Sequence, residues 1–174
     1  MRLSYSDSCS RLQKLGYLEQ GTVPPLPKRV PQYDDSDPLG VRFFRTRVEN
    51  DRLENLTLTR TFFGRSEILK VSFRNTDLSE SNFCWNDFVD VDFTDSCLES
   101  SDLRSSTFLR TRFIRSNLKN ADLRRSSFEG CDFEGAHLEG VTLHDSQKAL
   151  LRLSADQIRQ IAWTSDEGPE PGGG

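Results

Sequence analysis

The chain has 174 residues and a formal net charge of -4, with 34% hydrophobic and 29% charged residues. This balance is thin for the core of a round globule and suits an elongated single domain with a narrow core. The charge argues against direct nucleic-acid binding by phosphate neutralisation. No stretch approaches the 18 apolar residues of a membrane span, and no apolar segment of a secretory signal follows Met1. We therefore expect a cytoplasmic protein without membrane contact.

Residues 1–40 are predicted to form an N-terminal capping helix followed by a proline-rich arm. The helix falls between residues 6 and 20, with Gly21 near its end. Its apolar residues lie on roughly one face: Leu12, Leu15 and Leu18. The prolines between residues 24 and 31 require an extended, polyproline-like run. This run is either a ligand for a proline-binding module or an arm laid along the rest of the protein.

From residue 43 onward, every fifth residue is large and apolar at 21 consecutive positions. The positions are Phe43, Val48, Leu53, Leu58, Phe63, Ile68, Phe73, Leu78, Phe83, Phe88, Phe93, Leu98, Leu103, Phe108, Phe113, Leu118, Leu123, Phe128, Phe133, Leu138 and Leu143. A period of five matches neither a helix nor a strand. A five-residue unit that returns the same side inward must turn a corner each time. We call these residues the centres.

A second period of twenty relates the centres to one another. Stepping by twenty gives sets of like residues, for example Leu58, Leu78, Leu98, Leu118 and Leu138, or Phe73, Phe93, Phe113 and Phe133. The residue two before a centre is usually small, such as Ser106 or Ala121, and is expected to permit tight stacking. Four five-residue units therefore make one square coil, with successive coils stacked at the sheet spacing of about 4.8 Å.

The units resemble the pentapeptide-repeat family, whose repeat is written A-(D/N)-L-x-x. Residues 121–125 (Ala-Asp-Leu-Arg-Arg) match it at every fixed position, and residues 76–78, 101–103 and 131–133 are close variants. The resemblance implies an all-β fold, a right-handed quadrilateral β-helix of about five coils over residues 41–145, with short helical or extended caps. Because residues 51–53 and 56–58 depart from the pattern, we expect the first coil or two to be irregular.

Residues 146–163 are predicted to cap the other end of the solenoid. Ser154-Ala155-Asp156-Gln157 has the form of a capping box, which predicts a helix over residues 155–162. In several members of the family that the chain resembles, a C-terminal element forms a dimer contact. The chain is thus expected to be a monomer or a homodimer through this cap. Residues 164–174 are rich in Gly, Pro and acidic residues and are predicted to be a flexible tail.

The sequence shows no pattern of a catalytic centre. His137 and His144 flank centres at outward positions, and no nucleophile–base pair, H-E-x-x-H motif or phosphate loop is present. The four cysteines are irregularly spaced, without a C-x-x-C pair, which favours reduced thiols over a disulfide framework or zinc site. We predict no enzyme activity, no catalytic residue, no cofactor and no metal.

Charged residues form bands along the sequence. Residues 77–102 hold eight acids and no base, whereas residues 104–125 hold seven bases and one acid. In stacked coils these bands become rings of alternating sign. Either the rings form salt bridges between coils, or they are complementary to a partner. In the second case Asp87, Asp90 and Asp92 are candidate partner-binding residues.

An apolar surface feature is also predicted. Leu69, Val89 and Leu109 each follow a centre, face outward and are spaced by twenty, so they should form a ridge. Trp85 leads into the same face, and Ile114 lies around the next corner. Such a patch usually marks a contact. Either the N-terminal arm covers it, or it binds a partner through Leu69, Val89, Leu109, Trp85 and Ile114.

Three functions follow as hypotheses. The first is a non-catalytic protein-binding solenoid, such as a bacterial immunity protein or a regulator that occludes one target protein. The second, implied by the quinolone-resistance members of the family that the chain resembles, is a DNA mimic that binds DNA gyrase or topoisomerase. The third is a purely structural scaffold. The expected partner is another protein, without direct contact with nucleic acid.

Overall fold

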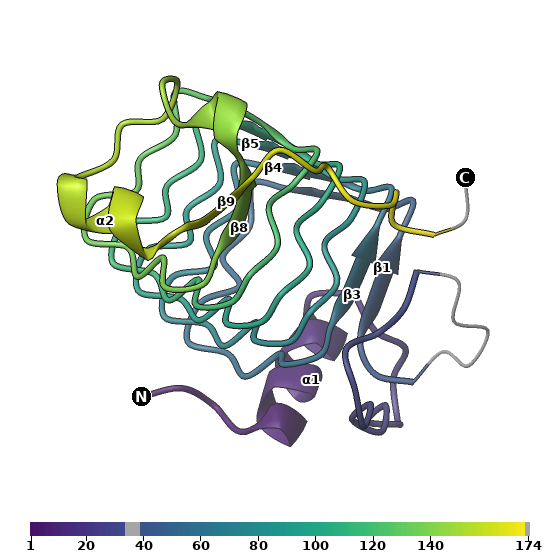
Figure 1. Cartoon of the computed structure of the whole chain (residues 1–174). Helices are drawn as coiled ribbons and strands as arrows, with labels where there is room; N and C mark the ends of the chain where they lie inside the picture. The colour runs from purple at the N-terminus through teal and green to yellow at the C-terminus, as the bar shows by residue number, and fades with distance from the viewer. Residues whose placement is uncertain (34–38, 173–174) are drawn as a thin grey trace.

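The computed structural model describes residues 1–33 and 39–172. The chain folds into a right-handed, four-sided β-helix of about six turns, with short helices near its two ends (Figure 1). The helices are α1 (Tyr5–Lys14), the 3-10 helix η1 (Asp145–Gln147) and α2 (Ala155–Gln160). The strands are β1 (Arg42–Phe44), β2 (Arg47–Glu49), β3 (Phe62–Gly64), β4 (Glu67–Leu69), β5 (Asp87–Val89), β6 (Thr107–Leu109), β7 (Ser127–Glu129), β8 (Thr142–His144) and β9 (Ala162–Thr164).

The predicted period of twenty is the register of the strands. β2, β4, β5, β6 and β7 form a five-stranded parallel sheet, in which Ile68 pairs with Phe88 and Phe88 pairs with Phe108. The other sides of the coils are joined by single parallel bridges at the same interval, for example Asp92 to Arg112. The prediction of an all-β, quadrilateral β-helix is therefore confirmed.

Centres stack on centres along the inside of the solenoid. The rings of Phe93 and Phe113 are fully buried and lie 5.4 Å apart at an interplanar angle of 11°. The rings of Phe88 and Phe108 lie 4.9 Å apart and are nearly parallel, at 2°. Aromatic stacking adds to the stabilisation that comes from burying apolar surface. The stacked rings therefore favour one alignment of each coil relative to the next coil.

The small position two before each centre also joins the coils. Ser106 accepts a hydrogen bond from the backbone N–H of Asn86, one coil earlier, and donates its hydroxyl to the Phe83 carbonyl. Hydroxyls at equivalent positions accept the same inter-coil hydrogen bond: Ser66, Thr76, Ser81, Ser101 and Ser126. These side chains satisfy backbone groups that are buried at the corners. Tight stacking is thus only part of their role.

Each corner contains a residue in the left-handed backbone region. From Arg45 to Arg125 every fifth residue is a non-glycine residue with φ between +47° and +62°. The last three such corners hold Gly130, Gly135 and Gly140. The left-handed region costs an L-residue about 1 kcal/mol or more, so most corners of the solenoid carry a small strain.

The N-terminal helix is shorter than the sequence predicted. α1 begins after Ser4, whose side chain accepts from the N–H of Asp7, and ends at Lys14, with Leu15 as its C-cap and Gly16, with φ of +83°, directly after it. Gly16 therefore ends the helix well before the predicted Gly21. The proline-rich arm then lies against the solenoid: Arg60 donates to the carbonyl of Pro27 (2.8 Å).

The expectation of an irregular first coil is wrong. β1 pairs in register with β3, and β2 pairs with β4. Leu56 stands two residues before the centre Leu58, where most repeats have a small residue, and it is buried in one core with Cys9 and Leu12 of α1. Asp51 stands at the same position before the centre Leu53, and it accepts a hydrogen bond from the hydroxyl of Tyr17 (2.6 Å). The N-terminal cap supplies the contacts that a preceding coil would otherwise make.

The C-terminal end contains one more strand than predicted. The capping box of Ser154 and Gln157 is present, and α2 ends at Gln160, two residues before the predicted end. β9 then pairs with β8, so that Trp163 lies in register with Leu143 and adds an incomplete sixth turn.

The segment after β9 contacts the solenoid, and its flexibility stays a prediction. Its described residues run back along the solenoid toward the end that carries α1 (Figure 1). Within the described parts of the chain, no helix is long and apolar enough to cross a bilayer.

Relief of corner strain should stabilise the protein. Ser100 has φ of +57° and is a corner residue. We expect Ser100→Gly to raise the free energy of unfolding by about 0.5–1 kcal/mol, because Gly adopts this region without steric cost. Ser127→Gly is the matched control, in the extended strand β7. Ser127→Gly should lower the free energy of unfolding. Thermal unfolding of both variants measures the two changes, and changes of the same sign would contradict the account.

Candidate functional site

The five-stranded sheet places three apolar side chains in a row on its outer surface. Residue Leu69 pairs with Val89, and Val89 pairs with Leu109, in consecutive strands β4, β5 and β6. Because the centres before them point inward, these residues point outward. All three are half-buried. We call Leu69, Val89 and Leu109 the apolar ridge, and its predicted alignment is confirmed by the register.

Acidic residues bound the ridge at both ends. Glu49 of β2 pairs with Leu69, and Glu129 of β7 pairs with Leu109. The exposed Asp87 lies in β5 at the outward position before Phe88. Among residues 1–33 and 39–172, no basic side chain forms an ion pair with Asp87. The sheet therefore presents a short apolar row beside an unneutralised carboxylate.

The other two predicted acidic residues are occupied within the protein. Arg110 binds Asp90 through two hydrogen bonds of 2.6 and 2.9 Å, which hold the pKa of Asp90 below its usual range. One oxygen of Asp92 accepts from the N–H of Thr94 (2.9 Å), and the other lies 3.9 Å from Arg74. Asp90 and Asp92 are therefore less available to a partner than Asp87.

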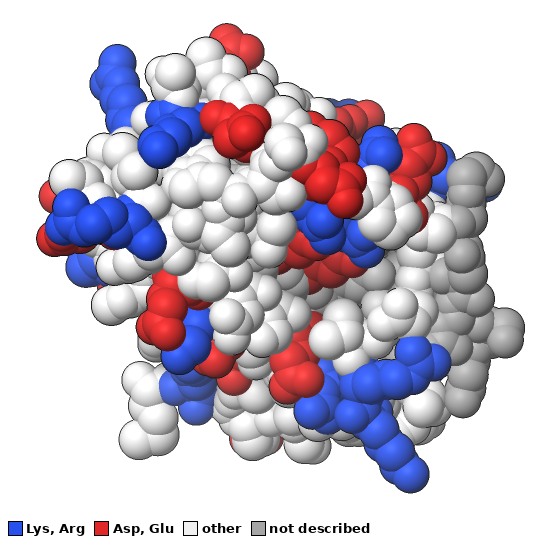
Figure 2. Space-filling view, viewed as in Figure 1, with Lys and Arg blue, Asp and Glu red and all other residues white. Residues whose placement is uncertain are grey.

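The alternating charge bands form salt bridges between coils. Several ion pairs join residues twenty apart in sequence: Arg47–Glu67, Arg60–Glu80, Asp90–Arg110, Asp95–Arg115 and Lys119–Glu139. Figure 2 shows acidic and basic side chains interspersed over the visible face. Of the two interpretations of the bands, inter-coil pairing is the one that the geometry supports.

Trp85 and Ile114 do not extend the ridge. Trp85 lies at the corner before β5, and its indole N–H donates to the carbonyl of Pro171 (3.2 Å). The guanidinium of Arg65 lies 5.6 Å from the Trp85 ring centroid. Ile114 follows Phe113, in the next side of the coil after β6. The sequence placed Trp85 at the corner that leads into the ridge face, and it lies at that corner, but nothing in the sequence indicated its contact with Pro171.

The N-terminal arm lies on a different side of the solenoid. Asn82 donates to the carbonyl of Pro31 (2.9 Å), and the ring of Tyr33 packs against Phe62 at 5.8 Å. Residues 62 and 82 belong to the side before the sheet, not to the sheet itself. The alternative in which the arm covers the ridge is therefore not supported by its contacts.

The reactive side chains show no arrangement of a catalytic or metal centre in the described residues. No group of three or more His, Cys, Asp or Glu side chains there could hold a metal ion. Burial raises the pKa of all four cysteine thiols: Cys9, Cys84, Cys97 and Cys131. A raised pKa disfavours the nucleophilic thiolate. His144 is engaged with Ser146, at 2.7 Å, at the start of η1.

The inter-coil ion pairs predict a dependence of stability on pH. The pKa of Asp90 is lowered from 3.8 mainly by its hydrogen bonds to Arg110. A lowered folded-state pKa gives stabilisation that is present above pH 3.8 and is lost as the pH falls through the folded-state value. We expect Arg110→Gln to lower the melting temperature slightly at neutral pH, with the difference shrinking as the pH falls below 3.8. Arg112→Gln is the control, because Arg112 lies outside the described ion pairs. If the loss of melting temperature in Arg110→Gln grew as the pH fell, the Asp90–Arg110 ion pair would not be its cause.

The comparisons with known proteins agree with this architecture. The family model for pentapeptide repeats matches residues 70–104 and 108–145 in eight copies. A pentapeptide repeat protein from the thylakoid lumen of Arabidopsis thaliana is similar in structure, with a TM-score of 0.59 and 23% identity, over 61% of this chain and 74% of that chain. No curated protein matches the chain in sequence.

Two further solved structures show weaker similarity. Rfr23 from the cyanobacterium Cyanothece 51142 has 14% identity and a TM-score of 0.41, over 59% of this chain and 83% of that chain. QnrB1, a plasmid-mediated fluoroquinolone resistance protein, has 15% identity and a TM-score of 0.37, over 60% of this chain and 57% of that chain. The repeat, the square coils and the matching family model lead to one conclusion: the chain belongs to the pentapeptide-repeat family.

Proposed function

We propose that this protein is a non-catalytic protein-binding solenoid whose partner docks on the apolar ridge. The observation that carries the proposal is the in-register row of Leu69, Val89 and Leu109 on the outer surface of the five-stranded sheet. Interfaces are dominated by a few apolar anchors surrounded by polar residues, and the ridge has this composition on a small scale. A regulator or immunity protein that occludes its target would act through such a surface.

The charges around the ridge define the chemistry of the partner. Asp87 is exposed beside the ridge and Glu129 bounds one end of it, whereas Glu49 at the other end is bound by Arg47 (2.5 Å). A fitting partner therefore presents apolar side chains flanked by Lys or Arg. Long-range attraction between these charges would raise the association rate, so that rate should fall as salt is added.

The DNA-mimic alternative has less support. A mimic of DNA requires a long surface of unneutralised negative charge. Here Asp90 and Asp95 are each bound by an arginine of the next coil, Arg110 and Arg115. A purely structural scaffold would not require an apolar row on the outer surface, so this alternative leaves the ridge without a role.

The oligomeric state and the cytoplasmic location stay predictions. The C-terminal cap carries one strongly exposed apolar side chain, Leu150, at 71% exposure. If the protein is a homodimer through this cap, Leu150 is the residue at which to disrupt the dimer.

Substitution of the ridge tests the proposed function. Leu109→Glu places a charge within the apolar ridge, and it should reduce partner binding at least tenfold while the free energy of unfolding changes by less than about 1 kcal/mol. Ile114→Glu is the matched control, because it makes the same change at a half-buried residue on another side of the coil. Affinity purification from the native host with the wild type and both variants, followed by thermal unfolding, measures the two effects. Equal recovery of the same partner by the wild type and Leu109→Glu would rule the ridge out.

A further inference from the structure

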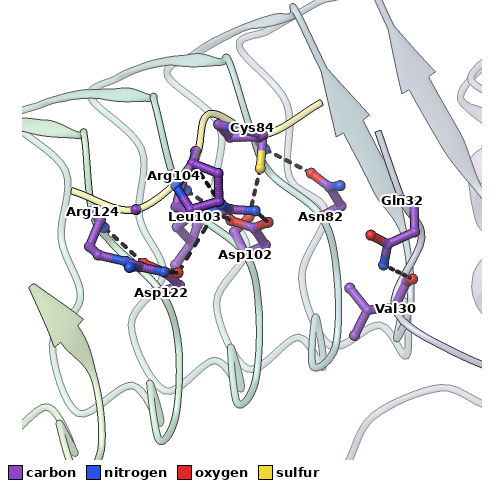
Figure 3. A network of polar contacts seen from close by, with 12 residues as sticks. Val30, Gln32, Asn82, Cys84, Asp102, Leu103, Arg104, Asp122 and Arg124 are labelled. Carbon is purple, nitrogen blue, oxygen red and sulfur yellow. Dashed lines mark hydrogen bonds and ion pairs between the residues drawn. The ribbon is translucent and has the colours of Figure 1, made fainter. Parts of the chain in front are cut away.

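The C-terminal segment, residues 165–172, crosses one side of the solenoid without forming a helix or strand. Figure 3 shows it, in pale yellow, passing over Cys84 and Arg104. The surface beneath it, which we call the tail groove, is formed by Cys84, Trp85, Arg104, Arg124 and Arg125. This groove lies on the side of the coils that precedes the five-stranded sheet and is separate from the apolar ridge.

The groove contacts the segment mainly through main-chain carbonyls. Trp85 donates to the carbonyl of Pro171, and Arg104 donates through Nη1 to the carbonyl of Pro169 (3.1 Å). Arg125 donates through Nε and Nη2 to the carbonyl of Gly168, at 3.2 and 3.0 Å. Recognition through carbonyls selects an extended backbone rather than particular side chains. Proline suits such a ligand, because it restricts the chain to extended conformations and has no N–H to satisfy.

Acidic side chains of the segment add a charge requirement. The carboxylate of Glu167 accepts the backbone N–H of Arg125 at 2.8 Å and lies 3.9 Å from His144. The carboxylate of Glu170 lies 3.6 Å from Nη1 of Arg125. Gly168 has φ of +65°, and a Cβ at this position would collide with the guanidinium of Arg124. The groove therefore fits an acidic segment with a glycine at the closest approach.

The floor of the groove is held in place by the solenoid itself. Asp102 binds Arg104 through hydrogen bonds of 2.8 and 2.6 Å and raises its pKa, and Asp122 binds Arg124 at 3.0 and 2.7 Å (Figure 3). The side chains of Arg104 and Arg124 are only 17% and 21% exposed. In each pair the arginine donates to the carboxylate through Nε and Nη2. Nη1 of Arg104 is therefore available to donate to the carbonyl of Pro169. Such preorganisation lowers the entropic cost of binding a ligand.

We propose that the tail groove binds extended, acidic, proline-containing segments of partner proteins, and that residues 165–172 occupy it as an intramolecular competitor. A segment tethered to the same chain has a high effective concentration at the groove. A partner segment must therefore bind the groove more tightly than residues 165–172 do, or bind it when these residues are released. This site goes beyond the proposed function of the ridge and does not depend on it.

A peptide titration on the full chain tests the proposal. The probe is a synthetic peptide with the sequence of residues 164–172. Glu167→Ala/Glu170→Ala removes two carboxylates of the tethered segment, and Glu19→Ala/Glu134→Ala removes two exposed carboxylates elsewhere as the matched control. We expect the first variant to bind the peptide at least tenfold more tightly than the wild type and the control variant. Site-resolved alkylation of Cys84, which is fully buried here, should increase in the first variant and decrease again when the peptide is added.

Further changes show whether the peptide binds in the tail groove and what it requires there. Adding Arg125→Ala to the first variant should weaken peptide binding about tenfold, whereas adding Leu109→Glu should leave it unchanged. A peptide in which both prolines are replaced by alanine should bind more weakly. Equal affinity of the wild type and the Glu167→Ala/Glu170→Ala variant, or no effect of Arg125→Ala, would overturn the proposal. Equal binding of the alanine peptide would overturn the preference for proline-containing segments.

Discussion

The structure depends on the stacking of each inward-facing centre on the centre twenty residues later. Phe73, Phe93, Phe113 and Phe133 form one such column, with ring centroids 4.9 to 5.4 Å apart. A slip by one residue would turn every centre outward and bury its polar neighbours. The column therefore fixes the register of every coil. The strained corners persist because the stacked columns and the inter-coil hydrogen bonds outweigh their cost.

Once the register is fixed, the outer surface follows from it. Residues twenty apart become neighbours on the surface, so that Asp90 meets Arg110 and Asp95 meets Arg115. The same rule aligns Leu69, Val89 and Leu109 into the ridge. The surface of this solenoid is thus arranged in columns, and the apolar ridge arises where a column departs from the prevailing pattern of paired charges.

The repeat itself could be predicted because every fifth side chain faces the core and is therefore large and apolar. The period also held a signal for the sixth turn: twenty residues after Leu143 stands Trp163, which pairs with it through β8 and β9. Leu56 and Asp51 gave a misleading signal, because their partners come from the N-terminal cap. The course of the C-terminal segment had no periodic signal at all. Its contacts use main-chain carbonyls, which every residue possesses, and the composition of the segment indicated only flexibility.

The central claim is that the register of five and twenty residues determines which side chains form the core. The same substitution at two phenylalanines tests it most directly. Phe93 is fully buried as a centre, whereas Phe44 directly follows a centre and is 47% exposed. Thermal unfolding should show that Phe93→Asp abolishes cooperative folding, because it buries a charge in an apolar column. Phe44→Asp should cost no more than about 1 kcal/mol. Similar melting temperatures for the two variants would contradict the register.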